Sequence, residues 1–564
     1  MKYSLRLLLL LGGWLLLGNP MARASHAQGG QLTYEYVGTA TLPNRYRVTC
    51  RFMRDCSGID APTSLTLNCR VGTSTTACTS TDSRNFTATL VRGVLTTGTP
   101  YCTSTGNACS SAGRPNYETA KYEAVVTLPP AASWTLSVQE NARPALANIT
   151  GGSQDLYLEA TLNNQITLAS GTTQTINNTS AQYFEQQAPT SFVCYQQRNT
   201  VSFLATEPDG DSLVYSLPAV QEGCNQPMTY KPTGFNSTTP IFDPSSTPQN
   251  PCLIYPSGLP QNYSAAYPIA SYEVTGNCPA RQVTPLFQFN PRQGTFTFRP
   301  ALYDATNPAN NKYTVVGKVT EYRRINGRYY QVGSVRRDIM VIVMDCGTNG
   351  LPGAVSSATP AAAAPDSLVV TAPYLGSSTV NFTFTDSNPN DVLTLTHTLP
   401  TDPLYASLYV NPSSPGLPIT LTNNGSTSPV LQVRLRPDAD VVGRTFRIPV
   451  RLEDNACPAK GVQNYVLVLR VTGNATATRP AARLLYSAYP NPFSEQVHFT
   501  LPRRAGQVDI VDQLGRVVDR LPVPAGAAAE TELTWTPRPT LPAGVYTARS
   551  ADGTQVVRLV RVQP

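Results

Sequence analysis

Histidine is scarce in this sequence. Only three occur in 564 residues, His26, His397 and His498, and no CxxC pair is present. Because structural zinc sites use spaced Cys and His ligands, the sequence argues against such a site. His397 lies in "LTLTHTLP", an alternating segment typical of a strand, and no GxSxG motif occurs. A Ser-His-Asp hydrolase is therefore not indicated.

Other enzyme motifs are missing as well. The sequence has no HExxH, no P-loop and no glycine pattern of a dinucleotide site. Carboxylate catalysis stays open, because a glycosidase needs two carboxylates whose separation in space the sequence does not fix. We therefore expect no catalytic or cofactor-binding residues, and a secreted hydrolase acting on polysaccharide or protein is the alternative.

Charged residues make up only 14% of the chain, whereas Pro (49) and Gly (38) are plentiful. This mixture disfavours long helices and favours short strands joined by turns. The content of apolar residues, 41%, with 28 Tyr, is too high for a disordered chain. A net charge of +7 is modest for this length, and we expect no nucleic-acid partner. The predicted class is all-β, with tandem antiparallel β-sandwiches of immunoglobulin-like type.

Long apolar runs are absent after the N-terminus, so we expect no transmembrane segment in the mature chain. Residues 1–27 are typical of a signal peptide. Lys2 and Arg6 precede an apolar run over 7–17, and small residues at Ala24 and Ala27 offer cleavage sites. That run is too short to span a bilayer comfortably.

Twelve cysteines are present, ten of them between Cys50 and Cys278. In an exported protein this number predicts disulfides. Their connectivity cannot be deduced, since the six cysteines of the first domain alone allow fifteen pairings.

Strand-like runs and polar breaks predict the following domains: a Cys-rich sandwich over 28–165, a sandwich with long loops over 166–347, a linker over 348–365, a sandwich over 366–473, a linker over 474–484 and a small sandwich over 485–564. Asn326-Gly327 predicts a two-residue hairpin turn. The segment 322–337 around it is rich in Arg and Tyr. Such a segment can hold a polyanion or a sugar, but we favour the solvated face of a hairpin.

Two acidic turns are candidate calcium sites. Glu207, Asp209 and Asp211 gather in "EPDGD", and a second turn, "DSNPND", contains Asp386, Asn388, Asn390 and Asp391. Calcium takes six to eight oxygen ligands and suits such loops. The alternative is an ordinary turn, because Asp, Asn, Pro and Gly are preferred in turns anyway.

The two acidic turns also belong to a weak internal repeat. "FLATEPDGDSLVYSLP" and "FTFTDSNPNDVLTLTHTLP" each show a strand, an acidic turn, a strand and a Leu-Pro stop. The phrase resembles cadherin-like and related immunoglobulin-like domains of tandem surface adhesins. In the first unit, "GGQLTYEYVG" and "YRVTCRFMRDCSG", within 29–58, resemble the start of gliding-motility adhesins and polycystic-kidney-type repeat proteins.

The tail carries the most specific pattern. Its conspicuous residues are Tyr489, Pro490, Asn491, Pro492 and Phe493 in "YPNPF", Gly515 in "DQLGR" and Gly544 in "LPAGVY". Glycine at the last two positions suggests backbone angles that other residues resist. In this order the motifs over 485–564 resemble the C-terminal sorting domain (type A) of the type IX secretion system.

That resemblance implies passage through the outer membrane by the type IX machinery. It also implies attachment to surface lipopolysaccharide or release, and thus a secreted or cell-surface location. Together with the tandem sandwiches it favours a non-catalytic binding or adhesion protein, with lipopolysaccharide or another glycan as anchor or ligand.

Overall fold

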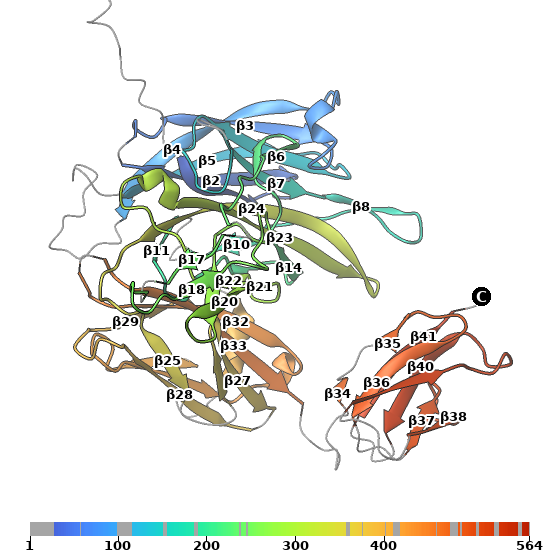
Figure 1. Ribbon diagram of the computed structural model, residues 1–564. Coiled ribbons are helices and arrows are strands. Elements are labelled where there is room, and N and C mark those ends of the chain that lie inside the picture. Colours follow the sequence, from blue (N-terminus) through green and yellow to red (C-terminus); the bar gives the residue numbers. More distant parts are fainter. Residues whose placement is uncertain are drawn as a thin grey trace, which may run out of the picture. The chain divides into compact units, whose positions relative to one another are not determined.

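The structure is a computed structural model. It describes residues 27–562 except 57, 99–115, 151–154, 185–189, 236–238, 244–245, 357–360, 375, 401, 410–417, 458, 474–482, 485–487, 503–506, 524–529 and 551–554. The chain divides into two compact units, Met1–Thr472 and Gly473–Pro564. Strands dominate the described residues, whose helical turns are all short and of the 3-10 type. None of their helices is long and apolar enough to cross a membrane. The all-β class is confirmed (Figure 1).

One large sheet organises the first unit. Its strands are β1 (Ala27–Tyr36), β2 (Arg45–Asp55), β5 (Tyr117–Thr127), β4 (Phe86–Gly98), β3 (Ser64–Val71), β6 (Trp134–Glu140), β7 (Leu156–Leu162), β24 (Arg328–Met344), β23 (Lys312–Ile325) and β14 (Ser212–Ser216) in that order, with β11 (Thr190–Cys194) also on β24. Several strands alternate inward apolar and outward polar residues: Leu65, Leu67 and Cys69 of β3 are buried between more exposed neighbours.

Strand β24 closes this sheet into a ring. One of its edges pairs with β23, and its other edge pairs in succession with β7 at 333–335, with β1 at 337–338 and with β11 at 340–344. From Val332 onward every residue of β24 is buried, which fits its apolar run over 339–344. The expected boundary at residue 165 therefore does not separate two sheets, because the strand that closes the first one comes from the segment expected to form the second.

A buried ion pair links β24 to Arg143, which follows β6 in the chain. Arg143 donates from Nη1 and Nη2 to the two carboxylate oxygens of Asp338 at 2.8 and 2.6 Å, and Thr314 Oγ1 donates to Asp338 at 3.0 Å. Both side chains of the pair are almost fully buried. Such a pair satisfies the charges that the sheet would otherwise bury alone.

The remaining elements of residues 165–311 are short. They comprise β8 (Gln165–Thr167), β9 (Thr173–Thr175), β10 (Gln182–Tyr183), β12 (Asn199–Ser202), β13 (Ala205–Thr206), β15 (Gln221–Gly223), β16 (Gln226–Pro227), β17 (Ile241–Phe242), β18 (Leu253–Tyr255), β19 (Tyr272–Thr275), β20 (Ala280–Pro285), β21 (Phe287–Asn290), β22 (Thr295–Phe298) and the turn η3 (Pro308–Asn311); η1 (Ala77–Thr79) lies earlier. Phe203 and Phe296 are fully buried and extend the core of the large sheet into this region.

Three disulfides pair described cysteines: Cys78–Cys224, Cys194–Cys346 and Cys252–Cys278. Cys56 and Cys457 are also disulfide-bonded. Cys102 and Cys109 lie outside the described residues. Cys50 and Cys69 are free and buried. The prediction that the cysteines pair is therefore correct for most of them and wrong for these two, which point from β2 and β3 into the core as small apolar side chains.

The third sandwich has two sheets. One contains β25 (Gly353–Ser356), β28 (Ser378–Thr385), β31 (Val430–Leu435) and β30 (Ile419–Thr422); the other contains β26 (Ala361–Ala364), β27 (Ser367–Pro373), β33 (Val462–Thr472), β32 (Thr445–Glu453) and β29 (Thr394–His397), with η4 (Pro403–Leu408) and η5 (Ala439–Val441) between strands. The segment 348–365, expected as a linker, thus supplies the edge strands β25 and β26. Strand β33 also contacts β12, where Asn464 Nδ2 donates to Thr200 O at 3.0 Å.

The second unit is a small sandwich of its own. Its sheets are β34 (Arg483–Leu484), β41 (Gln555–Arg561), β40 (Gly544–Ser550), β37 (Gln507–Val511) and β38 (Val517–Pro522), and β35 (Ala488–Tyr489), β36 (Val497–Pro502) and β39 (Glu530–Trp535). Buried Val508, Ile510 and Trp535 lie in its core. Of the expected linker 474–484 the structure describes only 483–484, and of the expected signal peptide only Ala27.

Candidate functional site

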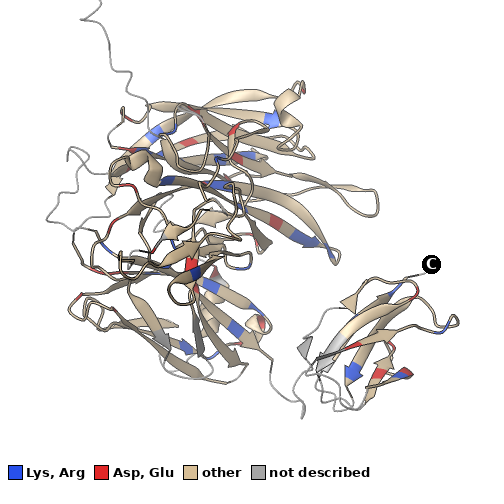
Figure 2. Cartoon of the chain, viewed as in Figure 1, with Lys and Arg blue, Asp and Glu red and all other residues tan. Residues whose placement is uncertain are grey.

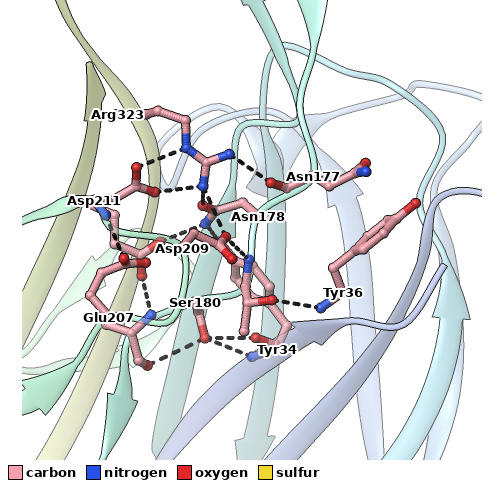
Figure 3. A network of polar contacts seen from close by, with 12 residues as sticks. Tyr34, Tyr36, Asn177, Asn178, Ser180, Glu207, Asp209, Asp211 and Arg323 are labelled. Carbon is pink, nitrogen blue, oxygen red and sulfur yellow. Dashed lines mark hydrogen bonds and ion pairs between the residues drawn. The ribbon is translucent and has the colours of Figure 1, made fainter. Parts of the chain in front are cut away.

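The first acidic turn connects β13 to β14. Gly210, with φ of +81°, allows the chain to reverse between the strands. As predicted, the carboxylates of Glu207, Asp209 and Asp211 converge, with one oxygen of each within 4.8 Å of the others. The three carboxylates thus offer oxygen ligands of the kind that bind a cation (Figure 3).

A guanidinium group already lies on this turn. Arg323 on β23 donates from Nε and Nη2 to the two oxygens of Asp211, both at 2.8 Å. Its Nη2 also donates to Asp209 at 2.9 Å and to Asn178 Oδ1 at 2.8 Å, and its Nη1 donates to Asn177 O at 2.8 Å. A bidentate Arg–carboxylate pair is among the stronger polar contacts in proteins. We therefore assign the counter-charge of this turn to Arg323, and calcium here stays a prediction.

A second buried carboxylate, that of Glu321, contacts the same Asn178 as the guanidinium. Glu321 accepts from Asn178 Nδ2 at 2.6 Å and from the Ala181 amide at 2.5 Å. Burial raises the pKa of Glu321 to about 8, against the effect of these two hydrogen bonds. Burial also raises the pKa of Glu207 to about 7, and Glu207 accepts from the Asp211 amide at 2.5 Å. Two protonatable carboxyls beside a fixed cation make this network sensitive to pH.

Sequence reasoning identified the acidic turn and missed its partners. Arg323 belongs to the segment 322–337, but nothing in the order of residues links it to a turn more than a hundred positions away. Asn178 lies in the polar stretch after 166 and has no motif around it. The pairing of β14 with β23, in which Ser212 faces Tyr322, brings the acidic turn beside Arg323.

In the structure a further carboxylate, which the sequence did not predict, lies beside the second acidic turn. Asp386 and Asp391 converge with Asp454, which follows β32, again with oxygens within 4.8 Å of one another. Asn388 Oδ1 instead accepts from the Gly350 amide at 2.9 Å, and Asn390 is exposed. Burial and the neighbouring Asp391 raise the pKa of Asp386; burial raises the pKa of Asp454.

The Arg- and Tyr-rich segment 322–337 divides into two parts. Around its turn Arg324, Arg328 and Tyr329 are exposed, and Figure 2 shows basic residues near the end of this hairpin. Arg336 and Arg337 are buried in β24, where Arg337 lies over the Tyr183 ring at 4.9 Å. The expectation of a solvated face therefore fits only the tip.

His397 lies on a strand, as expected, and is half-buried. It lies on β29 opposite Val450, and burial lowers its pKa. Within the described part of the chain, no Asp or Glu bonds to its ring.

The "YPNPF" segment attaches to the final strand. Asn491 Nδ2 donates to Arg558 O at 2.8 Å, and Asn491 Oδ1 accepts from the Val560 amide at 2.7 Å. The Phe493 backbone continues this contact at 2.9 Å to Val560, while its ring packs edge-on against Trp535. Asn491 and Phe493 thus join the beginning of the unit to its end.

The other conspicuous residues of the tail occupy different environments. Tyr489 is 56% exposed, stacks on His498 and hydrogen-bonds Glu532, so it lies outside the core. Gly515 has φ of +79° in the β37–β38 turn, as predicted. Gly544 begins β40 without a positive φ, so the prediction of unusual backbone angles is wrong at this position. Pro490 and Pro492 flank Asn491 on the way from β35 into the sandwich.

Residues 487–561 match the family described as secretion system C-terminal sorting domain. This region is a type IX sorting domain. The sorting domain directs the protein to secretion and display at the cell surface, and it makes the type IX machinery a partner of this chain.

For the chain upstream of the sorting domain, comparison with known proteins is less informative. No curated protein matches the chain significantly. Among solved structures, an endo-fucoidan hydrolase, MfFcnA4 of glycoside hydrolase family 107, is 16% identical over 52% of this chain with a TM-score of 0.15, and this chain spans only 39% of its length. The ectodomain of mouse nectin-like molecule 4 is 15% identical over 66% of this chain and 98% of its own, with a TM-score of 0.17. Four N-terminal immunoglobulin domains of Dscam1 isoform 6.44 are 8% identical over 95% of this chain and 100% of theirs, at 0.15. Scores this low carry no inference about function.

Proposed function

We propose that this protein is a non-catalytic binding or adhesion protein of the cell surface. The observation that carries the proposal is the exposed tip of the β23–β24 hairpin, in a chain whose sorting domain directs it to the surface. A protein that binds a partner at the cell surface needs exposed side chains to contact it, and this tip presents such side chains.

The tip presents cationic and aromatic groups from a fixed backbone. Arg324 lies directly opposite Tyr329, and Ile325 opposite Arg328, around the Asn326-Gly327 turn. Both turn residues have positive φ, 50° and 81°, as the favoured two-residue turn requires. Tyr329 is 59% exposed. Guanidinium and tyrosine groups at a rigid turn suit an anionic glycan such as the sugar part of lipopolysaccharide.

The residue pair directly behind the tip, Arg323 and Tyr330, is anchored by contacts outside the hairpin. Arg323 ties β23 to the acidic turn, and the Tyr330 hydroxyl accepts from the Ala169 amide at 3.0 Å. Because the hairpin is anchored so close to its tip, a ligand need not order it on binding, which lowers the entropic cost of binding.

Binding of the purified protein to immobilised lipopolysaccharide and to a glycan panel tests this proposal. We expect the double variant Arg324→Ala/Tyr329→Ala to bind at least tenfold more weakly, and Arg434→Ala, which removes an exposed Arg of β31, to bind as the unaltered protein does. Equal binding by all three proteins would contradict the role of the tip. Sustained turnover of a polysaccharide or protein substrate would favour the alternative, a secreted hydrolase.

A further inference from the structure

The two acidic clusters of the first unit differ in one respect. The first contains Arg323 as its cation. The second brings together Asp386, Asp391 and Asp454, and among the described residues none of the three forms an ion pair within 4.0 Å. The nearby basic residues Arg451 and Lys460 pair instead with Glu453. Three gathered carboxylates without a positive charge repel one another.

Several oxygens of this second cluster are buried and lack partners. Asp386 Oδ2 and Asp391 Oδ2 are shielded from solvent and accept no hydrogen bond. Asp454 is only 2% exposed; its Oδ1 accepts from the Gly461 and Ala456 amides at 2.8 and 3.0 Å, which fixes the carboxylate in place. Buried acceptors without a donor are rare, because each loses its hydration without compensation.

A neutral side chain adds a fourth group. Asn349 is 5% exposed, and its Nδ2 donates to Asp454 Oδ2 at 3.0 Å, so its amide faces the cluster. The Oδ1 of the same amide is buried and without a partner. Because the two ends of an amide can exchange by rotation, this oxygen can turn toward Asp454 when a cation removes the need for a donor there.

We propose that Asp386, Asp391, Asp454 and Asn349 bind a calcium ion. The ligands are all oxygens, three of them charged, as calcium prefers. Two oxygens on one calcium ion lie at most about 5 Å apart, since each is about 2.3–2.6 Å from the ion, and the carboxylate oxygens here meet that limit. Water would complete the shell, as in many calcium sites.

The position of the ligands gives the ion a structural role. Asn349 follows Cys346, which is bonded to Cys194 beside the large sheet, whereas the aspartates belong to loops of the third sandwich. An ion at this point would fasten the start of the third sandwich to the preceding sheet. This role is independent of the proposed binding at the hairpin tip.

Calorimetric titration of the purified, chelator-treated protein with calcium chloride tests the proposal. We expect saturable binding with half-saturation at about 0.1–1 mM, the range of extracellular modules, and a higher midpoint of thermal unfolding with calcium. Asp391→Asn and Asp386→Asn should each weaken binding more than tenfold. In the presence of chelator Asp391→Asn should be at least as stable as the unaltered protein, because the substitution removes a repelling charge. That result would demonstrate that the variant folds.

Two control variants complete the test. Asp402→Asn makes the same change elsewhere in the third sandwich, and Asp209→Asn makes it in the cluster that Arg323 neutralises. Both should bind calcium as the unaltered protein does. Absence of binding in the unaltered protein, an undiminished affinity in Asp391→Asn, or an equal response to magnesium chloride would each overturn the assignment.

Discussion

Arg323 and Asp211 meet through two parallel hydrogen bonds, Nε to Oδ1 and Nη2 to Oδ2, each of 2.8 Å. The Asp211 side chain is 2% exposed and that of Arg323 is 21% exposed. The contact therefore lies between a surface ion pair, which contributes little, and a fully buried one, whose loss is costly.

Removing the cation from this contact should destabilise the first unit. We expect Arg323→Ala to lower the free energy of unfolding by about 3 kcal/mol, near the lower end for breaking a buried pair, because Asp211 is left buried and unpaired. Urea unfolding measures the loss. In the double variant Arg323→Ala/Asp211→Asn much of it should return; strictly additive losses would show that the two residues do not interact.

The same variant opens the first acidic turn to metal ions. Without the guanidinium, Glu207, Asp209 and Asp211 would gather unneutralised, so millimolar calcium should raise the thermal midpoint of Arg323→Ala/Asp391→Asn. In Asp391→Asn alone, where Arg323 is present, calcium should raise the midpoint much less. A response of Asp391→Asn equal to that of the double variant would mean that Arg323 does not exclude calcium.

Stability should fall as the pH rises from about 5 to 8. Glu321 has its pKa raised to about 8 by burial, so the folded protein keeps a proton that the unfolded chain has lost near pH 4.5. The contribution of Glu321 to stability is complete below its pKa in the unfolded chain, and it is lost as the pH rises through its pKa in the folded protein. A tenfold difference in proton affinity between the folded and unfolded states corresponds to about 1.4 kcal/mol of stability. Urea unfolding at several pH values should show a shallower slope for Glu321→Gln; an unchanged slope would mean that another group dominates.

In the sorting domain Phe493 is buried in the core, whereas Tyr489 is exposed and accessible to a partner. Phe493→Ala should destabilise the small sandwich by about 3–5 kcal/mol, since it empties a core position beside Trp535. Tyr489→Ala should leave its stability within about 0.5 kcal/mol, as usual for exposed side chains. If Tyr489 contacts the export machinery, Tyr489→Ala reduces surface display without destabilising the domain. Normal display of Tyr489→Ala would restrict the role of the motif to folding.

Deletion of 485–564 should keep the protein in the periplasm, because the sorting domain carries the information for outer-membrane passage. Fractionation and surface labelling of cells measure this. Arrival of the truncated chain at the surface would contradict the assignment of the tail.

The free thiols should be unreactive until the first unit unfolds. Burial raises the pKa of the Cys69 thiol to about 12, and burial raises that of Cys50 further, so neither forms thiolate at neutral pH. Under non-reducing conditions iodoacetamide should label Cys50 and Cys69 only in denaturant, as peptide mass spectrometry can show. Labelling of the native protein would mean that β2 or β3 opens readily.

Local signals in the sequence predicted local structure well. The alternation in β3, the Asn326-Gly327 turn and the positive φ of Gly515 each depend on neighbouring residues alone. Composition was less reliable: the Ala- and Pro-rich segment 348–365 has the composition of a linker, yet it forms β25 and β26, because an edge strand needs only a neighbour with free backbone groups.

Relationships between distant segments were beyond reach. The link between Arg323 and Asp211, the arrival of Asp454 beside Asp386, and the free state of Cys50 all depend on which strands pair. A pairing between segments so far apart in the chain leaves no periodic trace in a single sequence. The acidic residues of both candidate sites could therefore be named in advance, but not the groups that decide whether each needs an ion.

The closure of the large sheet by β24 sets an order of events for folding. After β1 to β7 have emerged from the inner membrane, both outer strands of that partial sheet still lack the neighbour that residues 333–338 will provide. The chain must thus be delivered as far as Asp338, out of 564 residues, before its first strand finds its final partner, a topology of high contact order and slow folding. During that interval the exposed edges invite pairing with other chains, so an exported fragment that stops before β24 should aggregate rather than fold.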